Sequence, residues 1–279
     1  MTSKQLRLRK YSFELRRRTL IVGILNVTPD SFSGDGVYED PAKAISRAIT
    51  MVKEGADIVD VGGESTRPGS ERVSSKEELL RVAPVVRGLV ECGVPISVDT
   101  YKPEVAREVL ELGADIINDI TGLRDPKMAE VIATYKAGVI IMHMKGEPKT
   151  MQDNPVYEGG VMEEVKDFLS SRIAKAKDAG IETERIVVDP GIGFGKTLNQ
   201  NLEIIRNLSS LKDLEQPVMV GPSRKSFIGE ILELPTDGRL EGTLAAVVAS
   251  VINGADIVRV HDVQECSRAT RMADAICRP

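Results

Sequence analysis

The chain has 279 residues, of which 42 % are hydrophobic and 28 % are charged, a composition typical of a folded protein. Its net charge of −5 argues against a general nucleic-acid-binding protein, which is usually basic. No apolar stretch reaches the roughly 18 residues of a membrane span, and the N-terminus lacks the apolar core of a secretion signal. We therefore expect a cytoplasmic protein that binds neither membrane nor nucleic acid.

Eight short apolar segments are predicted to be β-strands. Three of them begin at the isoleucine of a repeated Gly-Ala-Asp-Ile run. The glycine of this run suits a helix C-cap, and the isoleucine is the first residue of the strand. Continuous apolar runs of this kind are typical of strands buried on both faces, as in parallel sheets. In chain order the predicted strands are Leu20–Leu25, Ile58–Val61, Pro95–Val98, Ile116–Asn118, Gly138–Met142, Ile186–Asp189, Pro217–Val220 and Ile257–Val260.

Amphipathic segments with helix-start signals separate these strands. The signals are Asp-Pro pairs at 40–41 and 125–126, and capping boxes formed by Ser75 with Glu78 and by Thr197 with Gln200. Eight alternating units predict an α/β fold, a (βα)8 TIM barrel that takes residues 1–279 as a single domain. An open doubly wound sheet is the alternative, but no GxGxxG motif follows the first strand.

The segment before the first strand is basic, with six arginine and lysine residues between Arg7 and Arg18. We expect it to form an exposed strand or hairpin at the barrel floor. The alternatives are a transit peptide and an anion-binding arm.

Polar residues gather at the C-terminal ends of the predicted strands. In a parallel barrel these ends surround one mouth, where catalytic groups are found. In chain order they are Asn26, the run Gly62 to Arg67, Asp99, Asn118 with Asp119, His143, Asp189, the run Ser223 to Ser226, and Arg259 with His261. Two long polar loops, 26–36 and 62–75, are expected to act as lids or substrate-ordering segments.

The charges of these residues divide them into two sets. Cationic groups that suit phosphate are present at Arg67, Lys225, Arg259 and His261. The other set is Asp99, Asn118 and Asp189, whose oxygens suit a flat ligand edge with several N–H donors. Together the two sets predict a site for a nitrogen heterocycle that carries a phosphate-type group. With two histidines and no HExxH motif, a conventional histidine-rich zinc site is not expected.

Eight motifs, one for each predicted strand in order, resemble those of bacterial dihydropteroate synthases. They are NVTPDSFS, DVGGESTRPG, SVDT, NDITG, MHMKGEPKTMQ, DPGIGFGK, GPSRKSF and RVHDV, and together they cover about residues 20–265. The first loop departs from the family pattern SFSDGG, because here it reads SFSGDG and places its acid at Asp35.

The resemblance implies a cytoplasmic transferase of folate biosynthesis. Such an enzyme joins 4-aminobenzoate to 6-hydroxymethyl-7,8-dihydropterin diphosphate, releases diphosphate and forms 7,8-dihydropteroate, with Mg²⁺ as cofactor. The resemblance also implies a homodimer formed through the last helices, where residues 244–252 form an apolar run.

The resemblance further implies roles for individual residues. The pterin site is expected to contain Asp99, Asn118, Met142, Asp189, Phe194, Gly221 and Lys225. The diphosphate site is expected to contain Asn26, Arg259 and His261, with Asn26 also a metal ligand. The 4-aminobenzoate site is expected to contain Phe32, Thr66, Arg67, Pro68 and Ser226. The expected catalytic residues are Lys225, Asp99, Asp189 and Arg259.

Two other functions are compatible with a pterin-binding barrel. One is a pterin-dependent methyltransferase that acts with a corrinoid protein and needs no diphosphate site. The other is a non-catalytic pterin-binding barrel, which would be expected to lose Lys225, Arg259 or His261, and all three are present.

Overall fold

The computed structural model describes residues 5–15, 17–28, 40–65, 70, 72–146, 150–153 and 155–278. Its central sheet follows the predicted strands closely. The strands are β3 (Leu20–Asn26), β4 (Ile58–Gly62), β5 (Ile96–Asp99), β6 (Ile116–Asp119), β7 (Gly138–Met142), β8 (Ile186–Asp189), β9 (Met219–Val220) and β10 (Ile257–Val260).

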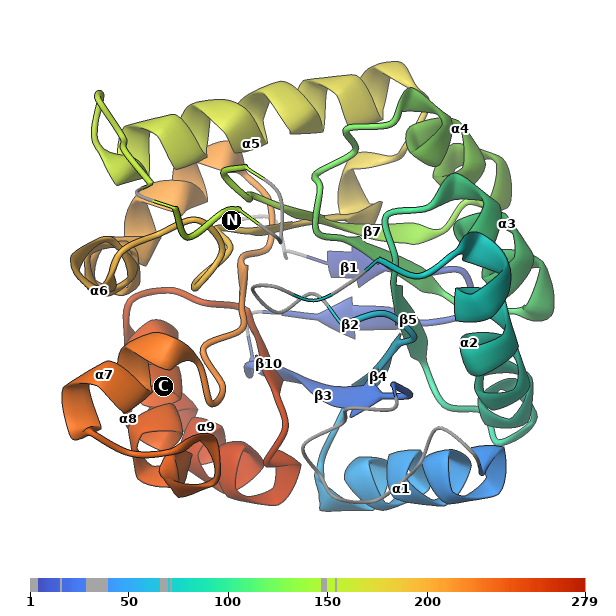
Figure 1. The fold of residues 1–279 in the computed structure, drawn as a ribbon, viewed down its shortest axis with the longest axis horizontal. Coiled ribbons are helices and arrows are strands. Elements are labelled where there is room, and N and C mark those ends of the chain that lie inside the picture. Colours follow the sequence, from blue (N-terminus) through green and yellow to red (C-terminus); the bar gives the residue numbers. More distant parts are fainter. Residues whose placement is uncertain are drawn as a thin grey trace.

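These eight strands are parallel and run in the spatial order β8-β7-β6-β5-β4-β3-β10-β9. The two ends of the sheet meet, because Val188 of β8 pairs in parallel with Val218, just ahead of β9. The Val188 amide donates to the Pro217 carbonyl at 2.9 Å across this junction. The sheet is therefore a closed barrel surrounded by helices, the predicted TIM barrel (Figure 1).

The helices lie between the strands and cover them from outside. They are α1 (Pro41–Glu54), α2 (Ser75–Glu91), α3 (Pro103–Leu112), α4 (Pro126–Tyr135), α5 (Val161–Asp178), α6 (Leu198–Arg206), α7 (Ser226–Leu232), α8 (Leu240–Ile252) and α9 (Val263–Cys277), with short 3₁₀ turns at Thr183–Arg185, Leu208–Leu214 and Thr236–Gly238. Among the described helices, none combines the length and apolar character needed to cross a bilayer.

Most of the predicted helix starts are confirmed. Asp40 and Asp125 cap α1 and α4, and the Thr197–Gln200 capping box begins α6. The predicted start of α2 is wrong by one residue, because Ser74 rather than Ser75 is the N-cap and accepts from the Glu77 amide at 3.2 Å. Glu78, the second residue of the predicted capping box, pairs with Lys102 instead.

The N-terminal segment closes the floor of the barrel, as expected. Strands β1 (Gln5–Arg7) and β2 (Ser12–Glu14) form an antiparallel hairpin across the centre of Figure 1. The buried side chains Leu6, Leu8 and Leu15 pack against the lowest inward-facing residues of the strands, which are Leu20, Val22, Ile58, Ile116, Ile140, Val187, Met219 and Ile257. This apolar plug separates the floor from the polar mouth.

Two basic side chains of this segment, Arg9 and Arg18, bind to the protein itself. Arg18 forms two hydrogen bonds with the Asp57 carboxylate, at 2.7 and 2.5 Å, and Arg9 donates to the Ala114 carbonyl at 3.0 Å. The end of α9 also reaches the floor, where Asp274 accepts from the Thr19 amide and hydroxyl, each at 2.7 Å, and Arg278 donates to the Leu15 carbonyl at 3.0 Å. These contacts give the arginines a structural role.

Candidate active site

One row of residues crosses four neighbouring strands at the mouth of the barrel. Asn26 pairs in register with Gly62, Gly62 with Asp99, and Asp99 with Asn118. The position of Gly62 keeps the row open, because an added Cβ there would lie 3.4 Å from Asn26 Oδ1 and 3.8 Å from Asp99 Cβ. The side chains of Asn26, Asp99 and Asn118, which come from three different sequence motifs, therefore lie at the same height along the barrel axis.

A buried carboxylate beneath this row connects its two sides. Asp60 is fully buried, and its Oδ2 accepts from Arg259 Nε at 2.6 Å and from Asn118 Nδ2 at 3.1 Å. The other end of the guanidinium reaches Asp99, with Nη2 to Oδ2 at 2.9 Å. Asp60 was not among the predicted site residues, although its position two residues before Gly62 places it on the same inward face of β4.

Three acceptors of this cluster have no donor. Asp60 Oδ1, Asp99 Oδ1 and Asn118 Oδ1 are buried and, within the described part of the chain, make no hydrogen bond. A buried acceptor without a donor costs on the order of 1–3 kcal/mol. The cluster is therefore suited to a ligand that presents several N–H groups.

The turn after β8 forms the opposite wall. Asp189 Oδ1 accepts from the Gly191 amide at 2.7 Å, and Lys225 Nζ donates to the Ile192 carbonyl and lies 4.4 Å from the centroid of the Phe194 ring. Met142 lies in the small buried cluster of methionines and Ile120 against which Phe194 packs. The predicted pterin residues Met142, Asp189, Phe194 and Lys225 are thus brought together.

Burial changes the acid–base properties of this site. It raises the pKa of Asp99 to about 7, although the Arg259 charge acts in the opposite direction. It lowers the pKa of Lys225 to about 8, against the attraction of Asp189. The pKa of Asp189 is raised mainly by burial, with Lys225 and Arg259 opposing the shift. Because these residues act on one another electrostatically, they form a single ionisable cluster.

The remaining predicted residues lie at the ends of β9 and β10 or beyond the described segments. His261 Nδ1 is 3.0 Å from Ser223 Oγ, and a Cβ added to Gly221 would lie 3.7 Å from Arg259 Cβ. Ser226 is the exposed first residue of α7. The residues Phe32, Asp35, Thr66, Arg67 and Pro68 lie outside the described residues.

His143 does not face the mouth, contrary to the expectation from its place at a strand end. Met142 points inward, so the next side chain points outward, where the His143 ring meets Phe168 of α5 edge-on at 5.0 Å. Its Nδ1 lies 3.0 Å from Lys196 Nζ. Burial, together with Lys196, lowers the pKa of His143 to about 2, which leaves the ring neutral.

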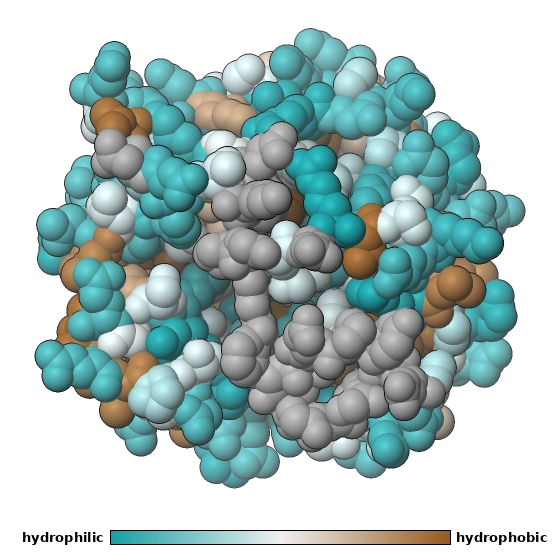
Figure 2. Space-filling model, viewed as in Figure 1, coloured by the Kyte–Doolittle hydropathy of each residue, from teal (hydrophilic) through white to brown (hydrophobic). Residues whose placement is uncertain are grey.

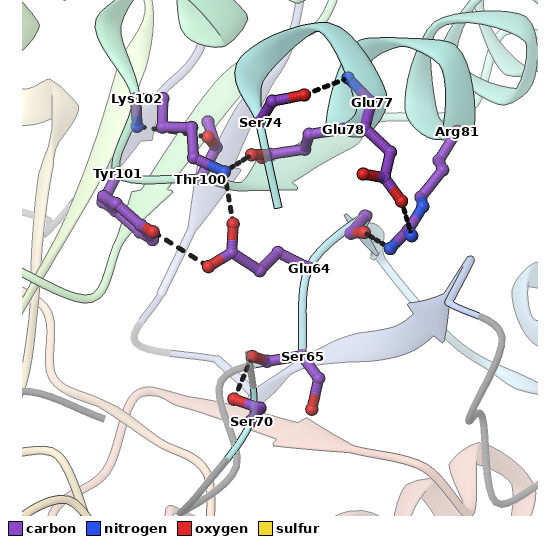
Figure 3. A network of polar contacts seen from close by, with 11 residues as sticks. Glu64, Ser65, Ser70, Ser74, Glu77, Glu78, Arg81, Thr100, Tyr101 and Lys102 are labelled. Atoms are coloured by element: carbon purple, nitrogen blue, oxygen red, sulfur yellow. Dashed lines mark hydrogen bonds and ion pairs between the residues drawn. The ribbon is translucent and has the colours of Figure 1, made fainter. Parts of the chain in front are cut away.

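An ion-pair network holds the start of the loop after β4 (Figure 3). The Lys102 ammonium contacts the Glu64 carboxylate and lies 2.5 Å from Glu78 Oε2, and the Tyr101 hydroxyl donates to Glu64 Oε1 at 2.8 Å. Glu78, the side chain that the sequence had assigned to a capping box, is 1 % exposed. The network fixes the point at which the chain leaves β4 for the predicted substrate-binding loop.

The residues present fit Mg²⁺ only as a phosphate-bound ion. Among the described residues, no group of three or more His, Cys, Asp or Glu side chains could hold a metal. Asn26 offers one carboxamide oxygen at the mouth, and no described residue donates a hydrogen bond to it. Mg²⁺ commonly takes one or two protein oxygens and completes its shell with water and phosphate, so Asn26 fits as its single protein ligand.

A closed parallel barrel with carboxylates, an amide, a lysine and an arginine at its C-terminal mouth defines a TIM-barrel enzyme that acts on a small charged molecule. The pterin binding enzyme family matches residues 22–261 of the chain. The dihydropteroate synthase of Synechocystis sp. is 48 % identical over 269 residues, which are 95 % of this chain and 93 % of that protein.

Solved structures show the same relationship. The dihydropteroate synthase of Clostridium difficile, crystallised in the presence of pteroic acid, is 50 % identical, with a TM-score of 0.89 and coverage of 96 % of this chain and 100 % of that one. The Thermus thermophilus enzyme in complex with 4-aminobenzoate is 41 % identical, with a TM-score of 0.88 and coverage of 98 % and 99 %. The chain belongs to the dihydropteroate synthase family of pterin-binding enzymes.

Proposed function

We propose that this chain, with residues 1–279 as one pterin-binding domain, condenses 6-hydroxymethyl-7,8-dihydropterin diphosphate with 4-aminobenzoate. The products are 7,8-dihydropteroate and diphosphate. The observation that carries the proposal is the arrangement of Arg259 between Asp60 and Asp99, beside unsatisfied acceptors on Asp99 and Asn118. Similarity to enzymes studied with pteroic acid and 4-aminobenzoate supports this reaction over a corrinoid-dependent methyl transfer.

The acceptor side of the cluster binds the pterin. Asp99, Asn118 and Asp189 accept from its N–H groups, and their burial makes the hydrogen bonds selective, because a ligand without these donors leaves them unpaired. Lys225 lies against the Phe194 ring and donates to the acceptor edge of the pterin. The walls are Met142, Phe194 and Gly221.

The basic side neutralises the leaving group. Arg259 and His261 stabilise the negative charge that develops on diphosphate as the methylene C–O bond breaks. When bound, Mg²⁺ would add positive charge to the diphosphate, with Asn26 as its protein ligand. Asp99 and Asp189 favour the positive charge that this departure leaves on the pterin.

The second substrate supplies the nucleophile. Its amine attacks the pterin methylene carbon, a C–N bond replaces the C–O bond, and the amine loses a proton. We assign Phe32, Thr66, Arg67, Pro68 and Ser226 to 4-aminobenzoate, with Arg67 and Ser226 binding its carboxylate.

We also propose a cytoplasmic homodimer that uses α7, α8 and α9. Large hydrophobic side chains are exposed on these helices and the α7–α8 connection, at Ile231, Leu232, Leu234, Ile252, Met272 and Ile276. Hydrophobic residues gather at the left edge of Figure 2, over the region of α7 and α8. Exposed patches of this kind commonly mark protein interfaces.

The deciding experiment mixes the protein with the pterin diphosphate, Mg²⁺ and isotopically labelled 4-aminobenzoate. We expect labelled 7,8-dihydropteroate and one equivalent of diphosphate, and neither product with Lys225→Ala. Failure of the wild-type protein to form labelled product would refute the proposed activity. Sedimentation equilibrium tests the dimer separately, and a purely monomeric protein would contradict that part.

A further inference from the structure

The turn between β8 and α6, residues 190–197, contributes backbone as well as side chains to the candidate active site. It follows Asp189, carries Phe194 and supplies the Ile192 carbonyl to which Lys225 donates. Its glycines have positive φ, +71° at Gly191 and +81° at Gly193, and the Phe194 amide donates to the Gly191 carbonyl at 3.1 Å across the turn. Carbonyls that this irregular backbone leaves without an amide donor need donors from side chains.

A lysine with no role in the proposed reaction supplies these donors. Lys196 is 2 % exposed, and its Nζ lies 2.9 Å from the Gly191 carbonyl and 3.0 Å from the Phe194 carbonyl. The third neighbour is His143 Nδ1 at 3.0 Å. Lys196 Nζ therefore has three polar neighbours, two of which are carbonyl oxygens of the turn. Within the described residues Lys196 forms no ion pair with a carboxylate, so its contacts are with the turn and the histidine.

His143 joins this lysine to the neighbouring strand. Its amide donates to the Asp189 carbonyl at 2.9 Å, and its ring packs against Phe168 and Tyr157. The turn passes close to it, because a Cβ added to Gly191 would lie 1.9 Å from the His143 carbonyl oxygen. The ring is therefore held on the helix side of the barrel, with its Nδ1 next to Lys196.

The contacts of Lys196 alternate along the turn with those of the site residues. The Gly191 amide binds Asp189 Oδ1, while its carbonyl binds Lys196. The Ile192 carbonyl binds Lys225, and the Phe194 carbonyl again binds Lys196. A shift of the turn would therefore move three groups together: the Gly191 amide that binds Asp189, the Ile192 carbonyl that binds Lys225, and the Phe194 ring.

We propose that Lys196, acting with His143, is a positioning residue for pterin binding, which it controls by holding the 190–197 turn in place. This inference rests on the proposed function, because it assigns the turn to the pterin side of the site. The aminobenzoate residues do not belong to this turn, so the two substrates should respond differently.

The test compares Lys196→Met with Lys175→Met, a matched control at an exposed position on the outer surface of α5. Calorimetry measures binding of the pterin diphosphate with Mg²⁺, and steady-state kinetics at saturating pterin diphosphate measures the KM for 4-aminobenzoate. We expect Lys196→Met to bind the pterin diphosphate about tenfold more weakly, with the aminobenzoate KM unchanged. The reason is that the Phe194 carbonyl loses its lysine donor and the Gly191 carbonyl keeps only the Phe194 amide. Lys175→Met should match the wild type in both.

A pair of histidine variants keeps the proposal testable if Lys196→Met does not fold. His143→Asn retains a polar group near the Nδ1 position and should bind the pterin diphosphate nearly as the wild type does. His143→Leu removes this polar partner of Lys196 and should bind the pterin diphosphate more weakly.

Two results would overturn the inference. One is unchanged pterin binding in folded Lys196→Met or in both histidine variants, and the other is an equal loss for both substrates, which indicates general damage. Failure of the wild-type protein to bind the pterin diphosphate would instead count against the proposed function.

Discussion

Arg259 and Asp99 form an ion pair across the mouth of the barrel, with Arg259 Nη2 2.9 Å from Asp99 Oδ2. The two residues come from β10 and β5, which are separated in the sheet by β3 and β4. The Arg259 guanidinium spans these strands with the help of Asp60 of β4, to which its Nε donates a hydrogen bond. A cation suited to diphosphate and an acid suited to pterin are thereby coupled before either ligand is bound.

This coupling predicts a narrow pH optimum for the reaction. Burial raises the pKa of Asp99 to about 7, so the carboxylate is lost as the pH falls through that value. Burial lowers the pKa of Lys225 to about 8, so its charge is lost as the pH rises through that value. We expect kcat/KM for the pterin diphosphate to be highest between about pH 7 and 8 and to fall on both sides. In Asp99→Asn the acidic limb should disappear, and its persistence would assign that limb to another group.

Asp60 should affect substrate binding although it lies beneath the site. In Asp60→Asn the Arg259 guanidinium loses a buried countercharge, and Asn118 meets an amide in place of a carboxylate. We expect the KM for the pterin diphosphate to rise by about tenfold or more. The matched control is Asp57→Asn, because Asp57 pairs with Arg18 at the floor. That variant should lose stability but keep its KM, and an equal rise of KM in both variants would contradict the assignment.

The network of Figure 3 should make Lys102 important for stability. In Lys102→Met, the carboxylates of Glu64 and Glu78, 7 % and 1 % exposed, would lose their shared cation. Leaving buried charge unpaired costs about 3–5 kcal/mol of unfolding free energy. Urea denaturation measures this loss, and adding Glu64→Gln and Glu78→Gln should restore part of it. If the triple variant were less stable than Lys102→Met, unpaired charge would not be the cause.

The floor should contribute to stability without affecting catalysis. Leu15 is fully buried beneath the barrel, and Leu15→Ala should lower the free energy of unfolding by about 2–5 kcal/mol. Substrate KM values should not change, because the site lies at the other end of the strands. Leu80→Ala, at a side chain that is 70 % exposed, is the control and should change stability by less than about 0.5 kcal/mol. A large change in KM for Leu15→Ala would show that floor and mouth are coupled.

The sequence predicted the barrel well because parallel strands carry a strong local signal. Gly138–Met142, Ile186–Asp189 and Ile257–Val260 have the predicted bounds, since each is a short, mostly apolar segment that follows a helix and leads into polar residues. The strand expected at Pro217–Val220 is shorter, Met219–Val220, and Val218 lies just before it, in an isolated bridge with Val188. That difference depends on how the barrel closes, which local sequence does not reveal.

The site was predicted less completely, for reasons that concern side-chain direction. Asp99, Asn118, Asp189, Lys225 and Arg259 lie together as expected. His143 points outward and Asp60 points inward, and both follow from the alternation of side chains along a strand, which the position of a residue at the strand end does not convey. The Lys196 contacts depend on an irregular turn that sequence patterns did not predict.

The hydrogen bonds from Thr19 and Arg278 that tie α9 to the barrel floor also determine which side of the molecule the end of this helix occupies. The end of α9 lies at the face opposite the substrate entrance, so a linker attached there would point away from the candidate active site. Immobilising the protein on a sensor surface through this end should leave the entrance open to solution, which suits measurements of ligand association.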